Sequence, residues 1–226
     1  MTADNDRTLI LDRIRLALRD IPDGEQAEDV PVPRRYQRSH ATGDLVALFA
    51  ERASDYRAAV TRTDERHLPA VIARLLSQRG IDVLLAPPRF PASWLAEWLA
   101  MSDTGTVAGD EPPLSVAHLD AMSGVVTTAA LAVAETGTIV LDGGPGQGRR
   151  ALTLLPDYHL CIVRAEQIAA DVPDAIHRLD PTRPITMISG PSATSDIENT
   201  RVEGVHGPRT LEIVIVEQRR PPGHAQ

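Results

Sequence analysis

A carboxylate and two hydroxyls surround one glycine in residues 134–138, where Glu135, Thr136, Gly137 and Thr138 follow an alanine. The runs on either side are apolar and are expected to be core strands. A carboxylate held there costs free energy unless it is paired or faces a cleft. Glu135 is therefore a candidate nucleophile, general base or acceptor that orients a ligand. The alternative interpretation is a turn in which Glu135 accepts backbone N–H groups and reaches solvent.

Residues 142–150 form a glycine-rich segment that ends in two arginines. Glycines let the backbone approach a ligand closely, and Arg149 and Arg150 can pair with an anion. The segment lacks the Lys-Ser/Thr end of the phosphate-binding P-loop, and its glycines do not form the dinucleotide-binding fingerprint. We therefore expect a mobile surface loop over residues 143–148.

A third segment, residues 189–198, leaves the end of an expected strand and enters an expected helix. Strand end, glycine and helix start together form an anion site, because unpaired N–H groups and the helix dipole point at the ligand. The two acidic side chains suit the dipole but would repel a phosphate, so a metal, a hydroxyl or a cationic partner fits them equally. The candidate ligand-binding residues here are Gly190, Ser192, Thr194, Asp196 and Glu198.

The loop that precedes the last expected strand carries His206 and Gly207. An imidazole held between glycines can titrate or donate a hydrogen bond near neutral pH. A histidine that faces solvent or bonds to the backbone is the commoner outcome. His159, at the start of another expected strand, is predicted to be structural.

The elements that must position these segments alternate between helical stripes and short β-rich runs. This alternation predicts an α/β fold with a mostly parallel sheet flanked by helices. Residues 135–137 would connect two strands as a hairpin or a sharp bend. Helices are expected after Asp64, ending at Gly80, and from Pro91, with Trp94, Leu95, Trp98 and Leu99 facing inward. Strands are expected at residues 81–85, 125–134, 138–141, 159–163, 185–189 and 211–216. Since open α/β sheets bind ligands at the carboxyl ends of their strands, the third segment is expected there.

The chain is expected to form an arm, residues 1–39, and one α/β domain, residues 40–226. Apolar side chains at three- and four-residue intervals predict a helix from about Arg7 to Arg19. The proline-rich stretch that follows has no period and is typical of a linker. The arm could pack on its own domain, on a second copy or on another protein.

Composition narrows the function classes. With 42% hydrophobic and 24% charged residues among 226, the chain is expected to build one sizeable core. The net charge of −8 disfavours nucleic acid and anionic lipid surfaces as partners. Cys161 is the only cysteine, which excludes a disulfide within the chain and an iron-sulfur cluster held by its own thiolates. No secretory signal and no apolar run of about 20 residues is present, so we expect no membrane span and a cytoplasmic protein.

In their order and spacing, the segments 134–138, 155–159, 189–198 and 204–208 resemble the LUD domain family over roughly Asp44 to Glu217. The resemblance implies a fold related to sugar-phosphate isomerases and CoA-transferases, the NagB/RpiA/CoA-transferase-like fold. It also implies a role in oxidising L-lactate to pyruvate beside partner proteins that carry iron-sulfur clusters, with no cofactor bound by this chain. The residues it marks as the expected site are Glu135, Ser192, Asp196 and His206. Ala193 departs from the family pattern, in which a basic or polar residue is common.

Three functions follow as hypotheses. The first is a non-redox component of a lactate-oxidising system, with a pocket for a small ligand bearing a carboxylate or phosphate. The second is a free-standing transferase-like or ligase-like enzyme in which Glu135 attacks an acyl group. The third is a module that senses a metabolite. Neighbouring genes for cysteine-rich iron-sulfur proteins would favour the first, and a neighbouring regulator the third.

Overall fold

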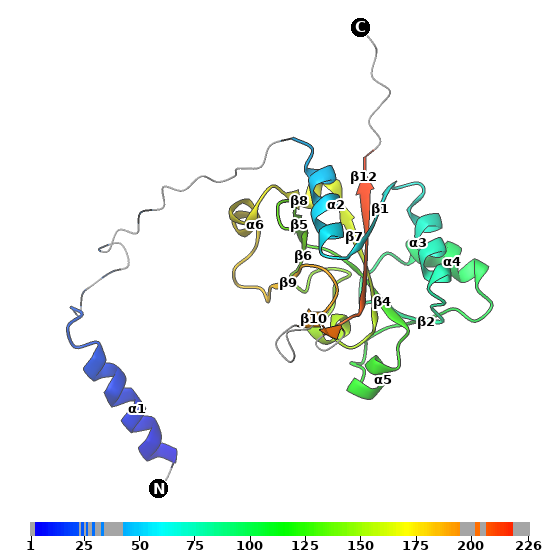
Figure 1. Ribbon diagram of the computed structural model, residues 1–226. Coiled ribbons are helices and arrows are strands. Elements are labelled where there is room, and N and C mark those ends of the chain that lie inside the picture. Colours follow the sequence, from blue (N-terminus) through cyan, green and yellow to red (C-terminus); the bar gives the residue numbers. More distant parts are fainter. Residues whose placement is uncertain are drawn as a thin grey trace. The chain divides into compact units, whose positions relative to one another are not determined.

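The computed structural model describes residues 3–22, 24, 26, 29, 33, 43–194, 202–203 and 207–218 (Figure 1). The chain divides into two compact units, Met1–Gln37 and Arg38–Gln226. The first contains helix α1 (Ala3–Ala17), which confirms the predicted N-terminal helix and begins four residues before its predicted start at Arg7. The predicted boundary at residue 39 lies outside the described residues. Within the described ranges, no helix combines the length and apolar character that a membrane crossing requires.

The second unit is built on a six-stranded sheet in which every neighbouring pair is parallel. Its central strands are apolar nearly throughout and buried on both faces, which is typical of a covered parallel sheet. The predicted α/β class and parallel sheet are confirmed. In spatial order the strands are β1 (Ala59–Asp64), β12 (Thr210–Glu217), β7 (Tyr158–Arg164), β4 (Gly124–Thr128), β2 (Val83–Leu85) and β3 (Thr106–Ala108).

A second, four-stranded mixed sheet lies beside the first. It contains the predicted hairpin, since β5 and β6 are antiparallel and joined by residues 134–137. The predicted single strand 125–134 is wrong: it is two strands, β4 and β5, that belong to different sheets. The break is hidden in the sequence because both strands are buried and apolar. In spatial order this sheet comprises β8 (Ile168–Ala169), β5 (Leu131–Val133), β6 (Thr138–Leu141) and β9 (Thr186–Ile188).

The six-stranded sheet is covered differently on its two faces (Figure 1). Helices α3 (Leu68–Gln78) and α4 (Ala96–Met101) pack on one face, around buried Trp98. Helix α2 (Leu45–Asp55) and the second sheet cover the other face, with Phe49 in the shared core. One face is therefore flanked by a helix and a sheet rather than by helices alone. The short helices that remain are α5 (Val116–Asp120), α6 (Val172–Arg178) and the 3₁₀ helices η2 (Ala92–Leu95), η3 (Arg150–Thr153) and η4 (Ala165–Gln167).

Several local predictions need correction. Leu99 is 41% exposed, whereas the other three predicted inward residues of its segment are buried. Asp64 does not cap α3 directly: its carboxylate accepts the backbone N–H groups of Arg66 and His67 in the preceding turn. Residues 195–198 of the segment expected to enter a helix lie outside the described residues, and residues 193–194 are extended. The latter form β10 (Ala193–Thr194), which pairs with β11 (Val202–Glu203) in an antiparallel ribbon.

Candidate functional site

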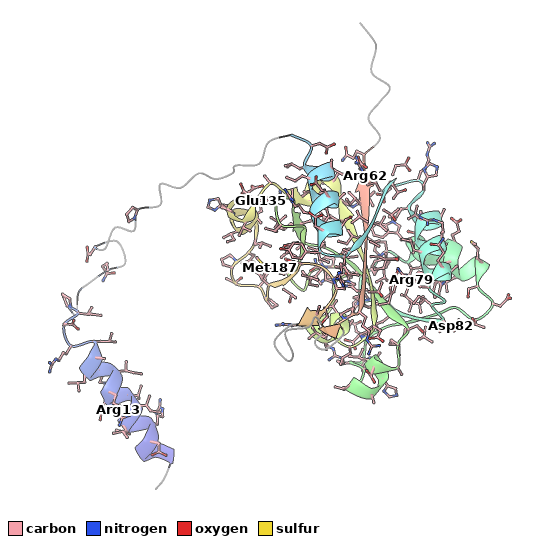
Figure 2. All side chains as sticks on the ribbon, viewed as in Figure 1. Arg13, Arg62, Arg79, Asp82, Glu135 and Met187 are labelled. Atoms are coloured by element: carbon pink, nitrogen blue, oxygen red, sulfur yellow. The ribbon has the colours of Figure 1, made fainter. Side chains whose placement is uncertain are left out.

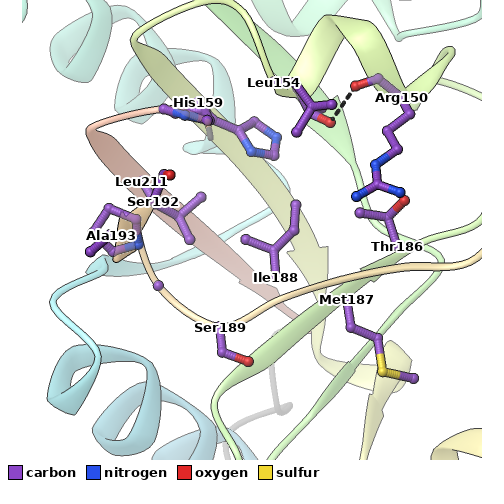
Figure 3. Close-up of a pocket in the computed structure, with 15 residues that line it drawn as sticks. Arg150, Leu154, His159, Thr186, Met187, Ile188, Ser189, Ser192, Ala193 and Leu211 are labelled. Atoms are coloured by element: carbon purple, nitrogen blue, oxygen red, sulfur yellow. Dashed lines mark hydrogen bonds between the residues drawn. The ribbon is translucent and has the colours of Figure 1, made fainter. Parts of the chain in front are cut away.

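A cavity of about 290 Å³ opens beside the amino-terminal ends of β7 and β12 (Figure 3). His159 of β7 and Leu211 of β12 form part of its wall, and residues 186–193 run along another side. Arg150 and Thr153 of η3 complete the polar part of the lining. The cavity thus gathers side chains from both sheets and from the segment after the glycine-rich loop. We call it the amino-edge cavity.

Arg150 carries the positive charge of this cavity. Its side chain is exposed, and its guanidinium extends into the cavity (Figure 3). In the described part of the chain, that guanidinium has no hydrogen-bond or ion-pair partner. The residue also borders a neighbouring cavity of about 390 Å³ together with Gly143 and Gly148. A guanidinium without a protein partner offers a planar set of N–H donors that matches a carboxylate or phosphate.

His159 supplies the buried polar group. It is only 1% exposed, and its Nε2 lies 2.7 Å from Oγ1 of Thr127. Burial lowers the pKa of His159 to about 4, so the imidazole is neutral at physiological pH. In the cavity, Arg150 is therefore joined by a second polar group that adds no charge.

Part of the third predicted segment lies at this cavity. Gly190, Ser192 and Gly207 line it, and the backbone N–H of Ser192 donates to the carbonyl oxygen of Pro208 at 2.9 Å. Thr194 belongs to β10. Three further candidates, Asp196, Glu198 and His206, lie outside the described residues.

The first predicted segment lies behind the wall of the cavity. Glu135 is exposed in the turn between β5 and β6, and Figure 2 shows it apart from Met187, which lines the cavity. Thr138 Oγ1 is bonded to Thr136 Oγ1 at 2.7 Å and to Oγ of Ser189, a lining residue, at 2.8 Å. The segment thus reaches the cavity through a hydroxyl contact and not through the carboxylate of Glu135.

The glycines of both segments have a packing role. Gly137 has a φ of +60° and Gly190 a φ of +81°, in the left-handed region that favours glycine. A Cβ on Gly137 would overlap the backbone nitrogen of Ala53 in α2, and one on Gly190 would overlap the carbonyl oxygen of Tyr56, just past that helix. Both chain segments therefore need glycine in order to pass close to the end of α2.

The glycine-rich segment, predicted to be a mobile surface loop, is partly buried and bonded through its side chains. Asp142 pairs with Arg183 at 2.6 Å, and its carboxylate accepts the backbone N–H of Gly144. Gln147 is buried, and its Oε1 accepts the N–H of Asp142 at 2.6 Å. These side-chain bonds, two within the loop and one to Arg183, could not be deduced from its glycine content. Arg149 forms a two-bonded ion pair with Asp110, and this leaves Arg150 as the arginine that meets the cavity.

A model of the LUD domain matches residues 46–216, a range that contains every lining residue of the amino-edge cavity. The chain belongs to the LUD domain family. It is 43% identical over 190 residues to a Deinococcus radiodurans protein named lactate utilization protein C, covering 82% of this chain and 84% of the relative. A protein of the same name from Halalkalibacterium halodurans is 26% identical over 208 residues, covering 87% and 90% of the two chains. The fold is similar to the crystal structure of a DUF162 family protein from Deinococcus radiodurans, with a TM-score of 0.64 and 37% identity, covering 80% of this chain and 99% of that chain.

The carboxyl edge of the large sheet in this LUD domain carries a different cavity, of about 440 Å³. Its charged lining is largely paired: Arg164 binds Glu65 at 2.8 Å, and Glu217 binds Arg62 at 2.7 Å. The third segment follows the end of a strand, as predicted, but it does not lie at the carboxyl edge of the parallel sheet. Residues 189–193 follow β9 of the second sheet, so the rule for the parallel sheet does not place them. Among the described residues, no group of three or more His, Cys, Asp and Glu could hold a metal ion.

Sequence reasoning did not connect Arg150 and His159, the two residues that define the cavity of this LUD domain. One signal for His159 was available. Side chains alternate along a strand, so His159 shares a face with Cys161 and Val163 and is the polar end of an otherwise apolar row. For Arg150 the sequence offers no such signal, because only the Arg149–Asp110 pair decides which of two adjacent arginines is free.

Proposed function

We propose that this chain serves L-lactate utilization as a non-redox component that binds a small carboxylate in the amino-edge cavity. The observation that carries the proposal is the guanidinium of Arg150, which meets the cavity without a partner among the described residues. The names of the relatives from Deinococcus radiodurans and Halalkalibacterium halodurans supply the metabolic context. We retain the CoA-transferase-like fold as part of this proposal, since a covered parallel sheet supports it.

The chemistry of the cavity suits a small organic anion. Arginine binds a carboxylate through two parallel N–H bonds, and such charge-assisted bonds are about twice as strong as neutral ones. The neutral imidazole of His159 adds a polar contact without repelling the guanidinium. A volume of about 290 Å³ lies at the lower end of ligand pockets and leaves room for a three-carbon acid with water.

The redox chemistry is proposed to reside on other chains. Oxidation of L-lactate to pyruvate releases two electrons and two protons, which an acceptor must take up. Cys161 is fully buried, and burial raises the pKa of its thiol to about 12, so it does not present a thiolate to a cluster. Partner proteins with iron-sulfur clusters are the proposed acceptors.

The transferase alternative depends on Glu135 as the nucleophile. A nucleophile must reach the bound substrate. Glu135 is exposed in its turn and is absent from the lining of the amino-edge cavity. The structure therefore gives this alternative no supporting contact.

The test is a direct binding measurement by calorimetry with pyruvate and L-lactate. We expect Arg150→Gln to weaken binding at least tenfold, because the charge-assisted pair is lost. Arg74→Gln is the matched control, since Arg74 is exposed on α3 and absent from the cavity lining. Glu135→Gln should also bind normally. Absence of binding to the wild-type chain, or equal affinity in Arg150→Gln, would refute the proposed site.

A further inference from the structure

The free nitrogen of His159 points to a second ligand contact, deeper than Arg150. Nε2 is bonded to Thr127, whereas Nδ1 has no hydrogen-bond partner among the described residues. Among the described residues, every fully buried side-chain nitrogen or oxygen has a hydrogen-bond partner. Because Nδ1 has none, it is not fully buried. His159 lines the cavity, and Figure 3 shows its ring directed into it. A nearly buried imidazole thus keeps one nitrogen available to a bound molecule.

The surroundings of Nε2 indicate which ring nitrogen of His159 carries the proton. Thr127 lies opposite Cys161 in the register of β4 and β7, and burial keeps the thiol of Cys161 protonated. A hydroxyl has one hydrogen to donate, and sulfur is a weak acceptor compared with an imidazole nitrogen. The separation of 2.7 Å between Thr127 Oγ1 and Nε2 fits a hydrogen bond in either direction. Thr127 is fully buried, and among the described residues its hydroxyl has no other nitrogen or oxygen acceptor, so donation to Nε2 is the arrangement that satisfies its hydrogen. Nε2 then accepts, and the proton of the neutral ring resides on Nδ1.

Two of the polar groups that line the cavity, Arg150 and His159, are therefore donors on two sides. Arg150 offers N–H groups at one side, and the Nδ1–H of His159 offers one at another (Figure 3). A simple monocarboxylate satisfies only the first. A carboxylic acid with an acceptor oxygen on the adjacent carbon satisfies both.

From this arrangement we infer that His159 is a specificity-determining residue that selects 2-oxo acids. The carboxylate of the ligand pairs with Arg150, and its 2-oxo oxygen accepts the Nδ1–H of His159. The inference rests on the proposed function, since it concerns the same cavity, and it adds the chemical class of the ligand. A 2-hydroxy acid can also accept this bond, but its own hydroxyl hydrogen then needs a further acceptor.

The first experiment compares pyruvate with propionate, which lacks the 2-oxo oxygen, on the full chain. One neutral hydrogen bond predicts about a three- to tenfold preference for pyruvate. In His159→Gln, an amide can still meet Thr127 but no group replaces Nδ1, so this preference should disappear. His159→Asn, whose amide can replace Nδ1–H, should restore part of it. Equal affinities of the wild-type chain for the two acids, both weakened by Arg150→Gln, would overturn the inference and leave the proposed function intact.

The second experiment does not depend on a variant that folds. Nitrogen-15 spectra of the histidine-labelled chain distinguish the two neutral tautomers of His159, assigned through backbone connectivities. We expect protonated Nδ1, with a shift of that resonance on addition of pyruvate and little change with propionate. Protonated Nε2, or no response to pyruvate at saturation, would overturn the assignment. Binding of neither acid would remove both the inference and the proposed function.

Discussion

At the residue scale, Arg150 and His159 differ in exposure and in charge. The guanidinium remains in contact with solvent, where a charge is inexpensive to keep. The imidazole is buried, and it avoids the much larger cost of a buried charge by staying neutral. The charge of Arg150 can therefore attract an anion, while the neutral His159 offers a second hydrogen-bond donor from the buried side of the cavity.

The buried imidazole makes stability sensitive to acid. The pKa of His159 is about 4 in the folded chain against 6.5 for the ordinary side chain, so the unfolded chain binds more protons between these values. The stabilisation is fully present above pH 6.5 and is lost as the pH falls toward 4, by roughly 3 kcal/mol in total. Urea unfolding monitored from pH 7 to pH 4 should show this loss.

Two comparisons test whether His159 causes the loss of stability at acidic pH. His118→Gln, a change at an exposed histidine of α5, should leave that loss unchanged. Arg149 lowers the pKa of Asp110, and Arg62 lowers the pKa of Glu217. A carboxylate with a lowered pKa stabilises the fold until it is protonated, so these two groups reduce the free energy of unfolding only at lower pH. A flat stability profile between pH 6.5 and pH 4.5 would contradict the burial of a neutral His159.

At the scale of elements, two strands meet the end of a helix through buried polar contacts. Glu212 of β12 accepts from the Tyr158 hydroxyl of β7 at 2.7 Å and from Arg79, at the end of α3, at 2.6 Å. Burial and the Glu212 carboxylate raise the pKa of Tyr158, so its hydroxyl remains a donor. This network lies near the start of β7 and β12, and it helps to fix the edge at which the cavity forms.

Two glycines, one in the hairpin and one in the loop after α3, distinguish the cost of backbone strain from the cost of steric overlap. Gly137 and Gly80 have nearly equal φ values, +60° and +63°, but a Cβ on Gly80 meets nothing within 4 Å. Gly80→Ala should therefore cost about 1 kcal/mol, the backbone strain alone. Gly137→Ala should cost at least about 2 kcal/mol more, because its Cβ overlaps the backbone of α2. Denaturant unfolding of both variants measures the difference, and equal losses would show that α2 yields freely.

The sequence predicts individual elements better than their assignment to sheets. Long apolar runs such as β7 and β12 are found from their composition, because strands buried on both faces carry little else. The same uniformity conceals the break between β4 and β5, since two residues between two buried strands look like a continuous strand. The amino-edge cavity depends on that break, because the second sheet places β9 beside β7. Its position could not be predicted without the sheet order.

At the scale of the whole molecule, the first compact unit, Met1–Gln37, carries exposed aliphatic side chains on its helix. Helix α1 leaves Leu9, Ile10 and Leu16 more than half exposed, at 53%, 58% and 63%. Taken by itself, such a helix suits packing against another surface, whether of its own domain, of a second copy or of another protein. If that surface belongs to an iron-sulfur partner, the arm joins the ligand-binding domain to the redox chains that the proposed function requires.

Deletion of residues 1–39 tests this role. We expect the melting temperature of the remaining domain to change by less than about 2 °C and its affinity for pyruvate to stay the same, because both depend on the second unit. The full-length and truncated chains are then tagged and purified from lactate-grown cells. We expect iron, sulfide and lactate-oxidising activity to co-purify with the full-length chain and not with the truncated chain. A drop in melting temperature would show that the arm stabilises its own domain, and a loss of self-association in sedimentation would assign it to a second copy. Undiminished recovery of iron-sulfur proteins by the truncated chain would place the docking surface on the LUD domain itself, and the apolar face of α1 would then need another explanation.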